Sequence, residues 1–166
     1  NAPLASSLLK KKVLIMGLGL HGGGVSSALF FARAGARVLV TDLKSEGDLA
    51  PSLKKLQRYK NISFVLGKHR PSDFEASDLV IRNPAVPNDS PYLKIARVRK
   101  IPVHTDVSWF LQQLPIINCQ LPIIIGITGT NGKSSAAALL HLVLTACGKK
   151  TILAGNIKKS PLDFLK

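Results

Sequence analysis

Short apolar runs alternate with segments of helical periodicity along the first two thirds of the chain. Runs rich in Val, Ile and Leu predict buried parallel strands, and apolar residues spaced i, i+3, i+4 and i+7 predict helices. The predicted strands are residues 13–16, 37–41, 62–66, 78–81 and 101–104. The predicted helices are residues 25–32, 49–59, 92–99 and 107–113. This alternation predicts an α/β fold with a parallel sheet and right-handed crossovers.

The pattern changes after residue 114. Residues 114–122 contain two prolines and no periodicity, so a domain boundary is expected there. Residues 123–127 then form another all-apolar run, residues 135–147 predict an apolar helix, and residues 151–154 begin a further strand. We therefore expect one domain at residues 1–114 and the start of a second at residues 115–166. The chain is expected to be a fragment, because its first residue is Asn and a complete second domain would need more strands.

A glycine-rich turn joins the first predicted strand to the first predicted helix. Residues 17–22 read GLGLHG, a spacing that permits a tight turn and lets a phosphate approach backbone N–H groups at a helix N-terminus. Asp42 follows at the end of the next strand, as in the Rossmann-like units that bind dinucleotides. A nicotinamide-dependent oxidoreductase is one interpretation of this turn. Glycines that only pack a helix against a strand are another.

A second glycine-rich turn follows the apolar run at residues 123–127. Residues 126–134 read GITGTNGKS, one residue longer than the usual spacing of a P-loop. Consecutive N–H groups would face a phosphate, the ammonium group of Lys133 would reach its outer oxygens, and the Ser134 hydroxyl would ligate Mg²⁺. This turn is the strongest chemical signal in the sequence. The oxidoreductase interpretation leaves it unexplained.

Composition and charge narrow the functional classes. A hydrophobic fraction of 46% in 166 residues supplies a core and excludes a disordered chain. The net charge of +14 would suit nucleic acid, but the basic residues are scattered and only 5% of residues are aromatic, so no nucleic-acid partner is expected. Residues 13–32 carry no Asp, Glu, Lys or Arg, but their five glycines make a poor membrane span. Two cysteines without metal-binding spacing fit a reducing compartment, so a cytoplasmic protein without a membrane partner is expected.

The second turn resembles the ATP loop of the Mur ligases, which has the same lengthened spacing. The similarity is greatest to the branch of that family that adds D-glutamate, and it lies in residues 17–22, 40–42, 82–87 and 155–157. It extends over nearly all of the chain, from about residue 12 to residue 165. It covers only the family's Rossmann-like first domain and the opening of its central P-loop ATPase-type α/β domain, so the resemblance implies no counterpart of the family's C-terminal domain in these residues.

The resemblance implies an ATP-dependent amide-bond ligase of peptidoglycan synthesis, present here as a fragment that binds but does not catalyse. Its substrates would be UDP-N-acetylmuramoyl-L-alanine and D-glutamate, its cofactors ATP and Mg²⁺, and the protein a monomer. The uridine substrate would contact Gly19, Leu20, His21, Asp42, Leu43, Lys44, Asn83, Pro84, Ala85 and Asn156. The ATP phosphates would contact Gly129, Thr130, Asn131, Gly132, Lys133, Ser134 and Ser135. Ser134 would bind Mg²⁺ and Lys133 would neutralise charge during phosphoryl transfer.

The same resemblance implies the order of the chemistry. The substrate carboxylate would be phosphorylated, and the amine of D-glutamate would then attack the acyl phosphate. Three positions depart from the family pattern: Ala85 and Lys158 stand in place of glycine, and His21 in place of threonine. Ala85 would matter if that residue needed a positive φ. A nucleotide-binding module without chemistry of its own is the remaining alternative.

Overall fold

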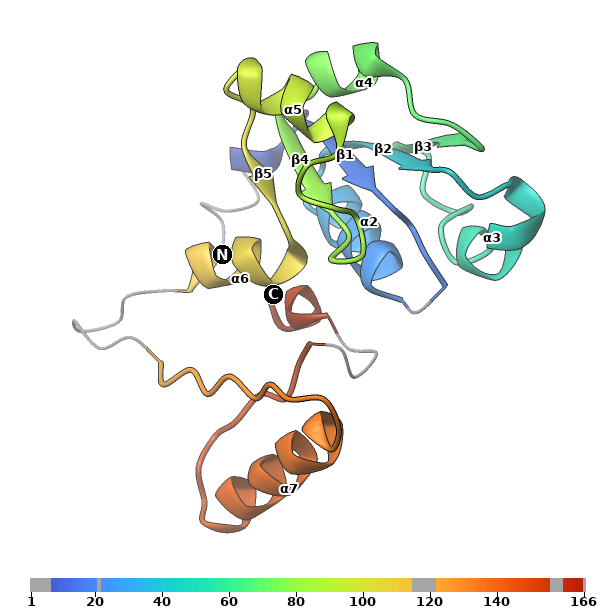
Figure 1. The fold of residues 1–166 in the computed structure, drawn as a ribbon. Coiled ribbons are helices and arrows are strands. Elements are labelled where there is room, and N and C mark those ends of the chain that lie inside the picture. The colour runs from blue at the N-terminus through green and yellow to red at the C-terminus, as the bar shows by residue number, and fades with distance from the viewer. Residues whose placement is uncertain (1–6, 21, 115–121, 156–159, 166) are drawn as a thin grey trace.

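The computed structural model describes residues 7–20, 22–114, 122–155 and 160–165. Within these ranges a five-stranded parallel sheet lies between two layers of helices (Figure 1). The strands are β1 (Lys12–Met16), β2 (Arg37–Asp42), β3 (Ile62–Leu66), β4 (Leu79–Arg82) and β5 (Val103–His104). The helices around the sheet are α2 (Gly23–Arg33), α3 (Glu46–Leu53), α4 (Pro71–Glu75), α5 (Pro91–Val98) and α6 (Asp106–Gln113). The predicted α/β fold with a parallel sheet is confirmed.

The strand order brings the carboxyl ends of β1, β2 and β4 together at one end of the sheet. The order is β3-β2-β1-β4-β5, so the chain builds one side of the sheet from β1 and then crosses to the other side at β4. Met16 at the end of β1 pairs with Thr41 of β2 and with Arg82 of β4. The loops that follow these three strands therefore leave the same edge. Open α/β sheets bind ligands at this edge, where the strand order reverses.

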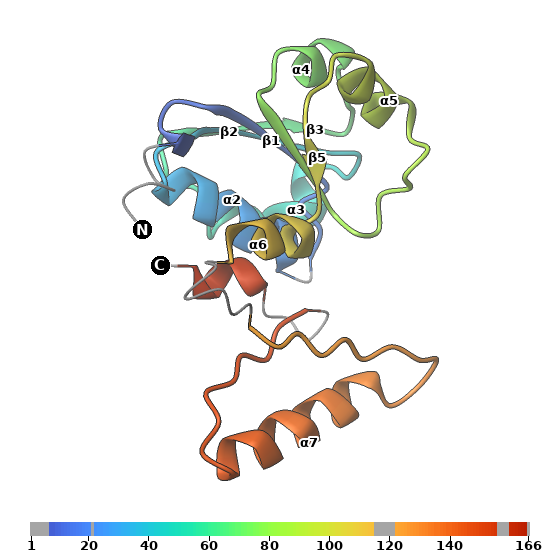
Figure 2. The ribbon, with the colours of Figure 1, turned by 90° about the vertical axis from the view of Figure 1, so that its left-hand side faces the viewer.

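Two apolar clusters join the sheet to its helices. Val13 and Ile15 of β1 belong to a cluster with α2 and α3, while Leu14 and Met16 belong to a cluster with α4 and α5. Figure 2 shows α2 and α6 on one side of the sheet and α4 and α5 on the other. Because β1 lies at the centre of the sheet, both of its faces are buried, as its continuous apolar sequence predicts.

Two helices of this unit differ from the prediction. Helix α3 covers residues 46–53 rather than 49–59, because Ser45 and Asp48 form a capping box that begins the helix earlier. The Ser45 hydroxyl accepts a hydrogen bond from the Asp48 N–H, and the Asp48 carboxylate accepts one from the Ser45 N–H. Helix α4 was not predicted, since five residues are too few to show a helical period.

The structure of residues 122–155 differs more from the prediction than that of the first unit does. Helix α7 (Lys133–Ala146) confirms the predicted apolar helix. Residues 123–127 form no strand, and the Ile123 side chain is 92% exposed. Residues 151–154 form no strand either. A strand is defined by its hydrogen bonds to a neighbour, and no described segment pairs with either run. In the described part of the chain, no helix has the length and apolarity needed to cross a membrane.

The last described residues return to the first unit. A short helix, η1 (Pro161–Phe164), lies beside α2 and α6 in both views (Figures 1 and 2). Leu162 is 1% exposed and belongs to the same apolar cluster as α2. The Ser160 hydroxyl donates to the Asp106 carboxylate over 2.9 Å, which fixes η1 against the start of α6. No sequence pattern predicts this contact.

Candidate functional site

The Asp42 carboxylate organises the first glycine-rich turn. One of its oxygens accepts hydrogen bonds from the backbone N–H groups of Leu18 (2.8 Å) and Gly19 (3.1 Å), and the other accepts one from the N–H of Lys44 (3.0 Å). Asp42 is buried, so these bonds replace the water that the carboxylate loses. A residue at the end of β2 therefore fixes the shape of the loop that follows β1.

The glycines of this turn are required by its geometry. Gly17, Gly19 and Gly22 all have φ angles between 61° and 97°, a left-handed backbone that side chains disfavour. Gly22 is the N-cap of α2 and no side chain caps this helix, so the first N–H groups of α2 stay available to an anion. At Gly24, a Cβ atom would lie 2.3 Å from the Leu18 carbonyl oxygen, so only glycine fits there.

The loop after β4 forms the other wall of the site. The Asn83 side-chain amide approaches the Gly17 carbonyl at 3.4 Å, and the Asn83 side-chain oxygen accepts from the N–H of Ala85 at 3.0 Å. Ala85 is not among the residues with a positive φ, so its replacement of glycine introduces no backbone strain. Asn83 therefore links the proline-rich loop to the glycine turn across the switch point of the sheet.

Exposed apolar and cationic side chains border the turn. Leu20 is 49% exposed and Leu43 is 66% exposed, although both are large hydrophobic residues. Lys44 follows directly and is also exposed. Apolar side chains beside a cation and free N–H groups suit a ligand that has a planar base and a phosphate.

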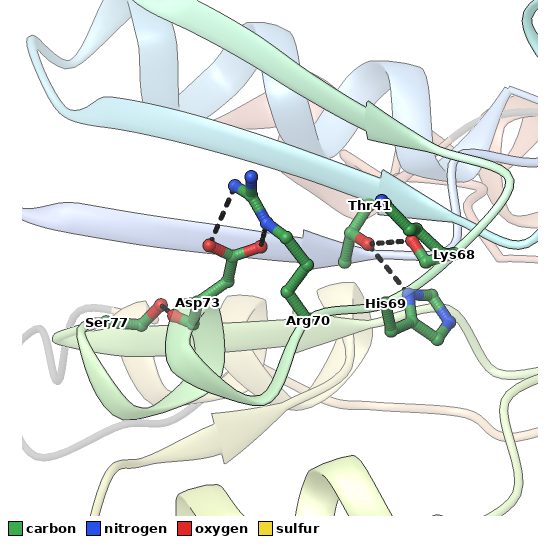
Figure 3. Close-up of polar contacts among 6 residues, drawn as sticks. All are labelled: Thr41, Lys68, His69, Arg70, Asp73 and Ser77. Atoms are coloured by element: carbon green, nitrogen blue, oxygen red, sulfur yellow. Dashed lines mark hydrogen bonds and ion pairs between the residues drawn. The ribbon is translucent and has the colours of Figure 1, made fainter.

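His69 lies on the loop after β3 and contacts Thr41, the residue before Asp42 in β2. Its Nδ1 atom is 2.7 Å from the hydroxyl oxygen of Thr41, and the Thr41 hydroxyl donates to the Lys68 carbonyl (Figure 3). Burial lowers the pKa of His69, and the nearby Asp42 carboxylate acts in the opposite direction. A neutral imidazole is therefore favoured beside the buried end of β2.

The second glycine-rich turn has the backbone of an anion site. Gly132, with φ of 74°, is the N-cap of α7, and no side chain caps this helix. The Lys133 ammonium group donates to the carbonyls of Gly129 (2.6 Å) and Thr130 (3.1 Å). Lys133 therefore lies over the loop, with Ser134 and Ser135 in the uncapped first turn of the helix. In both ribbon views this turn lies apart from the sheet.

The structure brings together most of the predicted uridine-site residues but reveals two that sequence reasoning missed. Residues 19–20, 42–44 and 83–85 lie on the three loops at one edge of the sheet. His21 and Asn156 lie outside the described residues, as does Lys158. The missed residues are Gly24, described above, and Ser52, whose buried hydroxyl donates to the Gly19 carbonyl at 2.8 Å. Gly24 was visible as an additional glycine after the motif, whereas nothing in the sequence marks Ser52.

Comparison with known proteins gives one consistent family. The chain is 44% identical over 164 residues to a UDP-N-acetylmuramoylalanine–D-glutamate ligase of Treponema pallidum, which covers 98% of this chain and 30% of that protein. It is 43% identical over 158 residues to the ligase of the same name from Roseiflexus, covering 95% of this chain and 32% of that protein. The chain thus spans about a third of the length of these relatives.

A solved structure and a family model agree with these relatives. The UDP-N-acetylmuramate-alanine ligase MurC of Thermotoga maritima superposes with a TM-score of 0.50 at 27% identity, covering 84% of this chain and 30% of that one. The family model described as "Mur ligase MurD-like, N-terminal domain" matches residues 11–105, which include the whole parallel sheet. The chain therefore belongs to the MurD-like N-terminal domain family of the Mur ligases.

Proposed function

We propose that this chain is the uridine-substrate-binding part, with the beginning of the ATP-binding part, of a ligase that adds D-glutamate to UDP-N-acetylmuramoyl-L-alanine. The observation that carries this proposal is the glycine turn that Asp42 shapes at the switch point of the sheet. The uncapped N-terminus of α2 and Lys44 would bind the diphosphate, and Leu20 and Leu43 would contact the uracil ring. His21 and Asn156 are further proposed contacts to the same substrate.

Residues 129–135 would bind ATP. The uncapped first turn of α7 would offer its N–H groups to the phosphates. The Lys133 ammonium group, which here donates to two loop carbonyls, would donate to phosphate oxygens instead when ATP binds. The Ser134 hydroxyl would be a ligand of Mg²⁺. Bound ATP would supply the phosphoryl group that activates the substrate carboxylate for attack by the amine of D-glutamate. Lys133 would stabilise the charge that develops during this transfer.

The proposal includes the organisation of the protein. Residues 1–114 would form the substrate domain and residues 115–166 the opening of the ATP domain. The protein would act in the cytoplasm as a monomer, with neither nucleic acid nor membrane as a partner. The family and the lengthened second turn support a ligase over a nicotinamide-dependent oxidoreductase, for which that turn has no use.

Replacement of Asp42 tests the substrate site. Asp42→Ala is expected to weaken the binding of UDP by about tenfold or more, because three N–H groups lose the acceptor that fixes the turn. Isothermal titration calorimetry with UDP measures the effect. Asp89→Ala, at an exposed position, removes the same charge and is expected to leave the affinity within about twofold. Equal affinities for UDP in wild type and Asp42→Ala would contradict the assignment.

Replacement of Lys133 tests the ATP site. Lys133→Ala is expected to lower the affinity for Mg²⁺-ATP by about tenfold or more, since the cation nearest to the phosphates is lost. Lys150→Ala, at an exposed position after α7, is the matched control and should bind Mg²⁺-ATP like the wild type. Unchanged ATP binding in Lys133→Ala would remove the basis for the ATP site.

A further inference from the structure

A hollow of about 520 Å³ lies at the opposite end of the sheet from the glycine turn. It is bordered by the starting residues of β1 and β2, by the residues that lead into β3, and by α4. Its lining residues include three cationic ones, Lys12, Arg37 and Lys60. Neither the uridine-binding turn nor the ATP loop contributes a residue to it.

The register of the sheet explains why two of these cations, Lys12 and Arg37, lie together. Lys12 and Arg37 are direct partners in the pairing of β1 with β2. Val38 pairs with Ile62, which places Lys60, two residues earlier, beside the start of β2. Partner residues of neighbouring parallel strands project from the same face of a sheet. Lys12 and Arg37 therefore project from one face of the sheet, and Lys60, in the turn before β3, is the third cation among the lining residues.

The acidic groups nearby are already engaged. The Asp73 carboxylate accepts two hydrogen bonds from the Arg70 guanidinium, at 2.8 and 2.9 Å (Figure 3). The Asp78 carboxylate accepts a hydrogen bond from the backbone N–H of Lys12 at 2.8 Å. In the part of the chain that the structure describes, no ion pair involves Lys12, Arg37 or Lys60. The hollow therefore keeps a net positive charge.

The floor of the hollow is partly apolar. Helices α4 and α5 pack over β1 and β4, as Leu14, Phe74 and Leu93 in their shared cluster indicate. On this face of the sheet, β2 and β3 are less covered than β1 and β4, because Leu39 of β2 is half-buried and Ser63 of β3 is exposed. The volume of the hollow is that of a site for a small molecule, about 300–1,000 Å³. Cations on the rim and an aliphatic floor suit a ligand that has both a phosphate and an uncharged part.

We propose that this hollow binds a small phosphorylated molecule with at least two negative charges. The phosphate would lie among Lys12, Arg37 and Lys60, and the uncharged part would contact Leu39. This site is additional to the two sites of the proposed function and does not depend on them.

Titration with inorganic pyrophosphate, followed by two-dimensional NMR of the amide groups and by calorimetry, tests the proposal. In the wild-type chain, shifts are expected at residues 12, 37–39, 60–63 and 76–77. The double variant Arg37→Gln/Lys60→Gln is expected to weaken this binding by about tenfold or more, since two of the three rim charges are lost. The control Lys54→Gln/Lys55→Gln removes two exposed charges near the end of α3 and should change the dissociation constant by less than about twofold.

Two further variants separate this site from other sources of phosphate binding. Ser63→Trp keeps the charge but fills the open floor, and it is expected to reduce binding of ADP more than binding of pyrophosphate. Lys133→Ala should leave the shifts at the hollow unchanged. The proposal is overturned if the two double variants weaken binding equally, if Lys133→Ala abolishes these shifts, or if pyrophosphate causes no saturable shift at the hollow.

Discussion

The chain contains the same local pattern twice, and only one copy folds completely. Residues 13–32 and residues 123–146 both read as an apolar run, a glycine-rich turn and an apolar helix. Both have a left-handed glycine at the N-cap and a helix that follows it. In the first copy the apolar run is a buried central strand, whereas in the second it is exposed and forms no strand.

The difference shows which parts of the motif are local. A turn and a helix need only their own residues, because their hydrogen bonds lie within the segment. A strand needs at least one neighbouring strand to accept and donate its hydrogen bonds, and β1 has two, β2 and β4. The helices repeat the contrast: α2 contributes six buried residues, including Phe31, and α7 contributes none. The first copy is therefore stabilised by packing, which the second lacks.

Amide hydrogen exchange should show the largest contrast between the two copies. The amides of residues 13–16 are expected to exchange at least about 10³-fold more slowly than those of residues 123–127, since only the former are held by a sheet whose opening approaches global unfolding. Exchange followed by mass spectrometry or NMR measures both segments in one sample. Comparable protection of the two segments would mean that residues 123–127 pair with a strand in solution.

Matched leucine truncations should differ by several kcal/mol. Leu14→Ala is expected to lower the free energy of unfolding by about 2–5 kcal/mol, because the Leu14 side chain of β1 is 0% exposed and packs against α4 and α5. Leu142→Ala in α7, where the side chain is 66% exposed, is expected to change it by less than about 0.5 kcal/mol. Urea unfolding measures both. Similar losses in the two variants would indicate that α7 is packed in solution.

Two adjacent glycines sharpen the comparison within the first copy. Gly24→Ala is expected to cost about 1–3 kcal/mol and to weaken UDP binding, since its Cβ would meet the carbonyls of Leu18 and Gly17 at 2.3 and 2.6 Å. Gly23→Ala is the control, because beyond the adjoining backbone no atom of the described residues lies within 4 Å of its added Cβ. Its stability should stay equal or rise slightly. Urea unfolding and UDP titration of both variants provide the measurement, and equal effects at the two positions would argue against the close packing of α2 on the turn.

The smallest expected effect is the pH dependence that His69 contributes. Burial lowers the pKa of His69 below the usual value for a histidine, so the unfolded chain binds a proton at a higher pH than the folded chain does. Stability should therefore fall as the pH drops below about 6.5 toward the pKa of the folded state. His69→Gln is expected to flatten this part of the profile in urea unfolding at several pH values. An NMR titration that placed the His69 midpoint above the usual range would reverse the sign.

The sequence predicted the parts of the fold that depend on local patterning. All five strands of the sheet were expected, as were α2, α5, α6 and α7, because their apolar residues follow one clear period. Helix α4 is too short to show a period, and the start of α3 depended on the Ser45 cap. The strand expected at residues 123–127 was wrong, since an apolar run specifies a strand only when other strands lie beside it.

The sequence predicted which motif forms the candidate site but not the tertiary hydrogen bonds that hold it in place. The glycine spacing and Asp42 were sufficient to indicate an anion site after β1. The roles of Ser52 and Asn83 as supports of the turn required the tertiary structure, because their partners Gly19 and Gly17 lie 33 and 66 residues away. The hydrogen bonds that Asp42 accepts from loop N–H groups also became visible only in the folded chain.

The most direct test of the central claim is a calorimetric titration of this chain with UDP-N-acetylmuramoyl-L-alanine, with NAD as the parallel ligand. Saturable binding of the uridine compound is expected at a stoichiometry of about one, and NAD should give no heat of binding. Binding of the uridine compound should also shift the NMR amide signals of residues 18–20 and 42–44. Binding of NAD with no response to the uridine compound would contradict the account and assign the glycine turn to a nicotinamide cofactor.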